Sequence, residues 1–252
     1  GGAPGRTGMG ERDVVLSVLA NVSIGLLTSV LGGCLVWLWE RGKHTRTLNR
    51  KGAFFGVRPG GTCLIVLGNK HDAPGAAHHR DVRATVELAM LAGELGCTVT
   101  VESDDFRGSN GDHTEFCVGG PLGGANARTA GHLSAHLPGV TFHPYGPEGD
   151  DSVAIEVAGQ RYRFDPGNQS YALVAKFTPQ EFRRPIILVC GQSAVANQAA
   201  IHFLRREYAQ VAARLATVER YCVLIKVSGI TTYDYHRAEF VGDVTGAAFG
   251  DG

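Results

Sequence analysis

The hydrophobic pattern divides the chain into one long apolar stretch near the N-terminus and a larger region in which short apolar runs alternate with amphipathic ones. Residues 14–39 contain no charged side chain. A helix of this length rises roughly 39 Å at about 1.5 Å per residue, which exceeds the approximately 30 Å of a bilayer's hydrocarbon core. We therefore predict a transmembrane helix at 14–39, preceded by a disordered segment at 1–13.

The charges that flank this stretch predict its orientation. Two arginines precede it and are offset by two acidic residues, whereas five basic residues follow it between positions 41 and 51. Positive side chains gather on the cytoplasmic side of membrane helices. We expect a single-pass protein of the cell membrane with its C-terminal domain in the cytoplasm. Residues 40–61 would form a basic juxtamembrane linker whose Phe54 and Phe55 contact the bilayer surface.

An exported protein is the alternative for this segment. The apolar run is longer than the core of a signal peptide and has no basic start. However, Leu31-Gly32-Gly33-Cys34 resembles the cleavage box of bacterial lipoproteins. In that case Cys34 would carry a lipid and the domain would lie outside the cytoplasm. The apolar residues at 35–39 favour the uncleaved helix, because a lipoprotein turns polar after its cysteine.

Small or hydrogen-bonding residues recur at every fourth position of the predicted membrane helix. These residues are Ser17, Asn21, Gly25, Ser29 and Gly33. Such a stripe lets two helix backbones approach closely in lipid and allows side chains to hydrogen-bond across the contact. We therefore predict a homo-oligomer that forms through the transmembrane helix.

Residues 62–252 show the alternation of an α/β domain. Short apolar or β-branched runs predict strands at 63–68, 97–103, 115–120, 140–143, 171–177, 185–191 and 221–227. Helical patterns lie at 82–95, 126–137 and 194–216. This alternation predicts a mainly parallel sheet covered on both faces, a three-layer Rossmann-like sandwich. Alternating polarity around Ala158-Gly159-Gln160 predicts a β-hairpin inserted on the sheet. We also expect the residues beyond 230 to form an edge strand.

Composition narrows the classes of partner. The chain has 24 basic and 24 acidic residues, so its charge gives no reason to expect nucleic acid as a partner. The six cysteines show no paired spacing such as C-x-x-C. Most lie in or beside apolar runs and are expected to be small buried residues in a reducing compartment.

Three of the predicted strands end in glycine followed by polar groups. In parallel sheets, ligands bind beyond the carboxyl ends of the strands, where helix N-termini present free N–H groups. We expect these loops to form one crevice for a nucleotide, a sugar phosphate or another polar anion, although ordinary loop geometry also explains the glycines. The candidate ligand-binding residues are Gly68, Asn69, Lys70, His71, Gly119, Gly120, Asn126, Thr129, Gly191, Gln192 and Ser193.

The motifs of well-known catalytic sites are absent or incomplete. No G-x-G-x-x-G follows the first predicted strand and no G-x-x-x-x-G-K-S/T occurs, so neither a conventional dinucleotide site nor a P-loop is predicted. Val195 replaces the second glycine that a nucleophile elbow at Ser193 would need. We therefore expect Ser193 to cap the helix that follows it, and we keep His71 and Ser193 as the candidate catalytic residues. The pattern predicts no metal site and identifies no cofactor.

A combination of short segments carries a family resemblance. It comprises Asp165-Pro166-Gly167-Asn168, the run YALVAK at 171–176, ILVCGQ at 187–192, Ala199-Ala200, and CVGGP with Asn126. At the level of pattern, residues 60–210 resemble a group of bacterial membrane-anchored Rossmann-like domains that has no assigned reaction. The resemblance implies the fold and says nothing about a substrate.

These observations lead to one functional hypothesis and two alternatives. We expect a membrane-anchored cytosolic sensor or effector domain that binds a small polar ligand, with a nucleotide as the first candidate, and signals through self-association. A hydrolase or transferase acting on a nucleotide or glycosyl substrate would use the same crevice, with His71 and either Ser193 or Asn126 in reacting roles. A non-catalytic membrane scaffold would leave the crevice empty. The residues do not decide whether the chain is an enzyme.

Overall fold

The structure, a computed structural model, describes residues 10–69, 76–103, 106, 111–122, 125–146 and 151–251. It comprises two compact units, Gly1–Thr47 and Leu48–Gly252. Helix α1, Glu11–Phe54, forms the described part of the first unit and contributes its last residues to the second.

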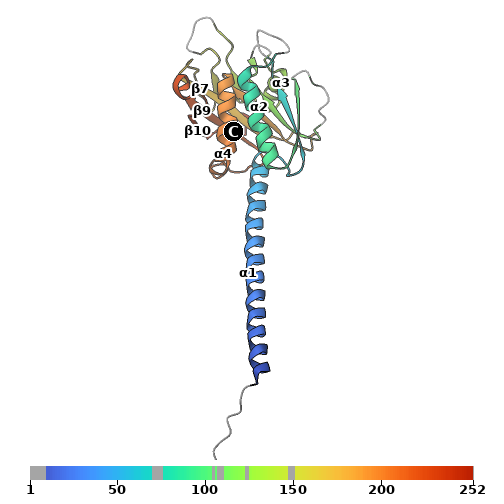
Figure 1. Ribbon diagram of the computed structural model, residues 1–252. Coiled ribbons are helices and arrows are strands. Elements are labelled where there is room, and N and C mark those ends of the chain that lie inside the picture. Colours follow the sequence, from blue (N-terminus) through green and yellow to red (C-terminus); the bar gives the residue numbers. More distant parts are fainter. Residues whose placement is uncertain are drawn as a thin grey trace, which may run out of the picture. The chain divides into compact units, whose positions relative to one another are not determined.

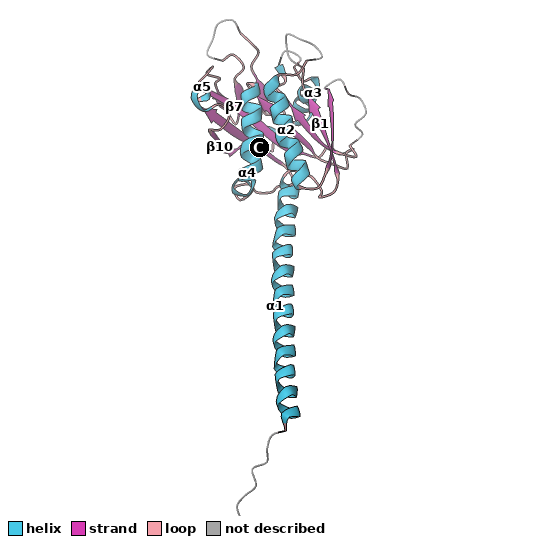
Figure 2. Ribbon diagram, viewed as in Figure 1, coloured by secondary structure: helices cyan, strands magenta, loops and turns pink. Residues whose placement is uncertain are grey.

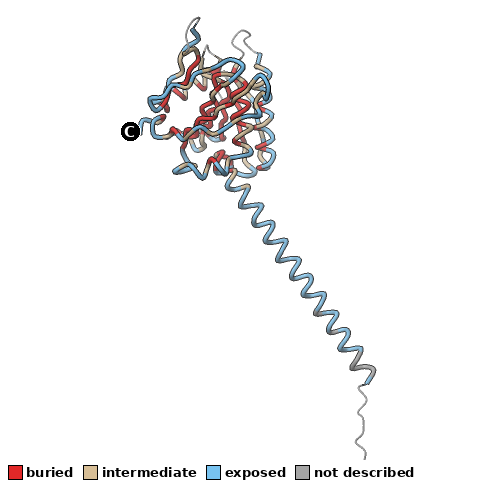
Figure 3. Tube along the Cα trace, turned by 90° about the vertical axis from the view of Figure 1, so that its left-hand side faces the viewer, coloured by how far each residue is buried: buried red, intermediate tan, exposed pale blue. Residues whose placement is uncertain are grey.

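In the first unit, α1 is exposed along its apolar stretch. The residues between 15 and 39 whose burial the structure describes are all exposed (Figure 3). By length and composition this helix could cross a membrane, and no other helix in the described ranges meets that description. Arg41 lies over the ring of Trp37 at 5.1 Å, and Lys43 lies 3.2 Å from the ring centroid of Trp39. Such pairs suit the boundary between lipid and water.

Helix α1 does not end where the apolar stretch ends. Residues 40–54, which we expected to form part of a linker, are helical. The physical reason is that this segment contains no proline before Pro59 and its glycines are isolated, so nothing breaks the backbone hydrogen bonding.

Seven strands form one mixed, mostly parallel sheet in the second unit, in the order β10-β9-β7-β8-β3-β1-β2 (Figures 1 and 2). Strands β2, β1, β3 and β8 run parallel to one another, and β7, β9 and β10 join through antiparallel pairs. The strands are β1 Thr62–Leu67, β2 Thr98–Ser103, β3 Thr114–Val118, β7 Gln169–Phe177, β8 Ile186–Gly191, β9 Tyr221–Ser228 and β10 Ala238–Asp243. The expected edge strand beyond residue 230 is β10.

A second sheet has the order β4-β5-β6 and consists of Val140–Phe142, Ile155–Val157 and Gln160–Tyr162. Strands β5 and β6 are antiparallel and are joined by Ala158 and Gly159, both with positive φ. This segment pairs with β4, whereas we expected it to be inserted on the main sheet.

Helices and the second sheet cover the two faces of the main sheet. Side chains alternate along β1, so that Cys63 and Ile65 belong to one core cluster and Leu64 and Val66 to the other. Helices α2, His79–Glu94, and α4, Ala194–Ala212, lie side by side over the first face (Figure 1). The second face is covered by α3, α6 and the second sheet, with α3 at Ala127–His136 and α6 at Thr245–Phe249. A short helix, α5, spans Ile230–Tyr233.

The aromatic pair at the end of α1 is buried in the domain. Phe54 is 0% exposed and Phe55 is 3% exposed. The ring of Phe54 stacks on that of Tyr221, with centroids 5.0 Å apart. The expectation that these two rings contact the bilayer is therefore wrong, because their apolar surface is removed from solvent by the domain core instead.

A buried lysine binds the end of α1. The Nζ atom of Lys176 on β7 donates hydrogen bonds to the backbone oxygens of Ala53 and Val218, each at 2.6 Å. The Lys176 residue is only 3% exposed, and burial lowers the pKa of its ammonium group to about 8. Lys176 thus adds a donor to the Ala53 carbonyl in the last turn of α1, which also accepts from the N–H of Gly56, and ties this turn to the loop before β9 through Val218.

This arrangement predicts how stability depends on pH. Between about pH 8 and the ordinary lysine pKa of 10.5, the unfolded chain binds the Lys176 proton and the folded chain releases it. The free energy of unfolding therefore rises with pH across this window, by roughly 3 kcal/mol in total. Urea unfolding of residues 48–252 should show that wild type gains this stability relative to Lys176→Met.

The control for that experiment is Lys226→Met on β9, whose ammonium is partly solvated and lies 3.9 Å from Glu239. We expect no comparable pH-dependent difference for this variant. A constant difference between wild type and Lys176→Met from pH 7 to pH 11 would contradict the assignment.

Candidate functional site

The three glycine-terminated strand ends meet at one edge of the sheet. Strands β1, β3 and β8 are adjacent and parallel, so their carboxyl ends lie together. A cleft of about 260 Å³ opens there, and its walls also include the first turns of α2 and α4. Of the predicted ligand-binding residues, the cleft is lined by Gly68, Asn69, Gly119, Gly120, Gly191, Gln192 and Ser193.

The glycines in these loops have a packing role. A Cβ atom at Gly68 would lie 2.4 Å from the oxygen of Ala125, and one at Gly120 would lie 2.9 Å from the oxygen of Gly191. Gly119 has a φ of +127°, which side chains rarely adopt. These residues are therefore glycine because the loops approach closely, and the chemistry of the cleft comes from its side chains.

Ser193 is the N-cap of α4. Its Oγ accepts a hydrogen bond from the backbone N–H of Ala196 at 3.3 Å and lies 2.9 Å from Oγ of Ser170. In the part of the chain that the structure describes, no histidine or carboxylate bonds to this hydroxyl. The geometry is that of a helix cap, and the residues in the described ranges supply no base that would activate Ser193 as a nucleophile.

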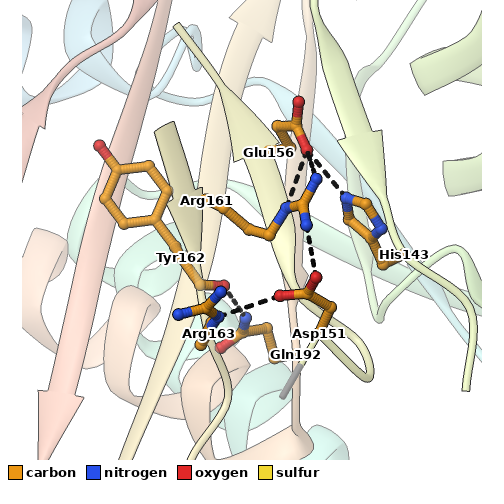
Figure 4. A network of polar contacts seen from close by, with 7 residues as sticks. All are labelled: His143, Asp151, Glu156, Arg161, Tyr162, Arg163 and Gln192. Atoms are coloured by element: carbon orange, nitrogen blue, oxygen red, sulfur yellow. Dashed lines mark hydrogen bonds and ion pairs between the residues drawn. The ribbon is translucent and has the colours of Figure 1, made fainter. Parts of the chain in front are cut away.

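Gln192 connects the two sheets beside the cleft. Its Oε1 accepts from the N–H of Tyr171 at 2.8 Å, and its Nε2 donates to the oxygen of Tyr162 at 2.6 Å. Figure 4 shows this amide next to an ion-pair network of the second sheet, in which Arg161 bonds to Glu156 at 2.7 Å. Both polar atoms of the Gln192 side chain thus have partners within the protein.

Asn126 and Thr129 do not line the cleft, and both are 0% exposed. The Asn126 amide donates to the oxygen of Val118 at 2.9 Å and accepts from the N–H of Thr129 at 2.9 Å. Asn126 is therefore the N-cap of α3 and also holds the end of β3. The expectation that these side chains reach into the crevice is wrong, because the cap uses the amide.

Two other predicted residues, Lys70 and His71, lie outside the described residues. The candidate catalytic role of His71 therefore stays a prediction.

Asp81 and Asn197 are cleft residues that the sequence reasoning missed. Nδ2 of Asn197 donates to Oδ1 of Asp81 at 2.9 Å, and Oδ1 of Asn197 accepts from the N–H of Gly191 at 2.6 Å. Burial raises the pKa of Asp81, an effect opposed by the Asn197 hydrogen bond and by the charges of His78 and His79. In the sequence, Asp81 directly precedes the helix predicted at 82–95, and nothing near it reveals its partner, which is 116 residues away.

Glu115, Cys117 and His132 place potential metal-ligating atoms within 4.8 Å of one another. However, Glu115 forms a two-pronged ion pair with Arg128, which includes a 2.8 Å bond, and the pKa of this carboxyl group is lowered. Burial raises the pKa of the Cys117 thiol well above its usual value. A guanidinium group thus already neutralises the carboxylate, and the thiol stays protonated, which disfavours a bound cation.

Comparison with known proteins gives no family assignment. No protein-family model matches the chain, and neither a curated protein nor a solved structure matches it significantly.

The cap of α3 gives a testable prediction. Asn126→Ala should lower the free energy of unfolding by about 1–3 kcal/mol, because the buried N–H of Thr129 loses its cap and the Val118 carbonyl keeps only its hydrogen bond from the N–H of Gly68. Urea unfolding measures this loss. Ser134→Ala, at an exposed position of the same helix, is the control and should change stability by less than about 0.5 kcal/mol. Equal effects of the two substitutions would contradict the cap assignment.

Proposed function

We propose that the chain is a single-pass protein of the cell membrane whose cytosolic, Rossmann-like α/β domain binds a small polar ligand, with a nucleotide as the first candidate. Ligand binding would be signalled through self-association of α1. The observation that carries the proposal is the cleft at the adjoining ends of β1, β3 and β8, with the Asp81 carboxyl group held in its wall. In parallel sheets this edge is the usual ligand site.

The size of the cleft supports a small ligand. Drug-sized ligands occupy clefts of about 300–1,000 Å³, and the cleft measures about 260 Å³. One nucleoside or sugar unit matches this volume better than a dinucleotide does. The aromatic residues Phe142 and Tyr145 also line it and would contact the flat face of a base or sugar ring.

The membrane location rests on α1 and its flanks. The helix is long and apolar enough to span a bilayer, and the basic residues that follow its apolar stretch favour a cytosolic domain. Asn21, Gly25, Ser29 and Gly33 are all exposed on the helix, so they are available for contact with a second copy.

A hydrolase or transferase is a second candidate because of Asp81. A carboxyl group whose pKa is raised by burial is suited to general acid–base catalysis. Conversion of a bound nucleotide to product by the purified chain would favour this candidate over a sensor.

Self-association can be tested in the helix itself. An added Cβ at Gly25 or Gly33 meets no atom within 4 Å, so Gly25→Leu with Gly33→Leu should leave the single helix intact. We expect this double variant to lose most self-association in a membrane reporter assay, because leucine keeps the backbones apart. The control, Leu27→Ile with Leu35→Ile, alters positions about 200° around the helix from the two glycines. Unchanged association of the glycine double variant would contradict the proposal.

Ligand binding can be tested by native mass spectrometry of the full chain purified from membranes in detergent. We expect a retained mass of nucleotide size. Ala194→Phe, which adds a ring at a residue lining the cleft, should reduce the bound fraction at least about tenfold, because the ring fills the space. Ala89→Phe, at an exposed position on α2, is the control. Equal retention by both variants would contradict binding in the cleft.

A further inference from the structure

We infer that Asp81 accepts hydrogen bonds from the ribose hydroxyl groups of the ligand, so that the sugar, and not the phosphate, lies against the first turn of α2. This inference rests on the proposed binding of a small ligand in the cleft. It assigns the cleft a ribonucleotide in preference to a deoxyribonucleotide.

The Asp81 carboxyl group is held in a fixed position. One of its oxygens, Oδ1, accepts from Asn197, whose own amide oxygen accepts from the N–H of Gly191 at the end of β8. Asn197 therefore joins α2, α4 and β8 in one hydrogen-bonded chain. A carboxylate placed in this way needs little rearrangement to bind a ligand.

The second oxygen, Oδ2, is the acceptor that remains. No hydrogen bond from any residue in the described ranges reaches Oδ2. Because Asp81 lines the cleft, this oxygen is available to a ligand bound there. The neighbouring Arg80 pairs with Asp234, and neither residue lines the cleft. The Oδ2 atom of Asp81 is not among the buried atoms that lack a partner, so it is open to solvent and a donor on the ligand can replace a water molecule there.

The charge of Asp81 also determines which part of a nucleotide it contacts. A phosphate group beside a carboxylate would be repelled, and the repulsion is strongest where water is partly excluded. Ribose hydroxyls are donors without charge, and two adjacent hydroxyls can bond to one carboxyl group. The phosphate would then lie toward the start of α4, where the first turn contains no acidic residue.

Isothermal titration calorimetry of the full chain in detergent tests this inference. The probes are the four ribonucleoside 5′-monophosphates, each with its 2′-deoxy and 2′,3′-dideoxy forms. We expect at least one ribonucleotide to bind wild type. Its dideoxy form should bind about 10–100-fold more weakly, because it cannot form the hydrogen bonds to the charged carboxyl group.

The protein variants complete the test. Asp81→Asn retains an oxygen for Asn197, and Asp81→Ala removes the carboxyl group entirely. Both should weaken ribonucleotide binding about tenfold or more, and removal of the ribose hydroxyls should then cause little further loss. Asp234→Asn, which removes the partner of Arg80 outside the cleft, should bind like wild type. Thermal unfolding of each variant verifies that it is folded.

Each other outcome overturns a defined part of the argument. Equal binding of ribonucleotide and dideoxynucleotide, or binding that is blocked by Ala194→Phe but unaffected by either Asp81 substitution, refutes the role of Asp81 and leaves the ligand cleft intact. If no probe binds wild type, both the nucleotide proposal and this inference fail. If Asp81→Ala unfolds, wild type and Asp81→Asn are compared instead. The inference holds if the preference for the hydroxyl-bearing probe over its dideoxy form is large in wild type and small in Asp81→Asn, and it fails if the two preferences are equal.

Discussion

The close approach of three strand ends is the constraint on which the cleft depends. Gly68 lies against the backbone of Ala125, and Gly120 lies against that of Gly191, at separations that leave no room for a Cβ atom. Because these loops contact each other through backbone atoms, the sheet edge presents a shallow floor without bulky side chains. The polar groups of the cleft are then supplied by the helices that follow, above all by Asp81 and Asn197.

Strand β7 connects this edge of the domain to its opposite end. It is paired along its length with β8 and β9, so its backbone is held on both sides. At the cleft end, the N–H of Tyr171 bonds to Gln192, and at the other end Lys176 bonds to the carbonyl of Ala53 in α1. The residues that line the cleft and the last turn of α1 are therefore both attached to the same central strand. This connection lies wholly within the second unit.

The sequence predicted the features that depend on local pattern. The apolar run of β8 and the Ser193 cap of α4 follow from neighbouring residues, and both are found in the structure. Features that depend on distant partners were missed. Phe54 was assigned to the bilayer because nothing near it reveals Tyr221, and Asn126 was assigned to the cleft because its bond to Val118 forms only when α3 folds back on β3. The Asp81–Asn197 pair belongs to the same class, since it joins helices far apart in the chain.

The first turns of α2 and α4 differ in a way that bears on the kind of ligand. Helix N-termini attract negative charge, and the sequence alone led us to expect a polar anion where two of them meet. However, α2 already has Asp81 in its first turn, whereas α4 has no acidic residue there. The dipole of α2 thus stabilises the protein's own carboxylate, and only α4 is left to favour an external anion. A ligand that matches both walls must therefore have an anionic end and an uncharged end rich in hydrogen-bond donors, which is the polarity of a nucleoside monophosphate or a sugar phosphate.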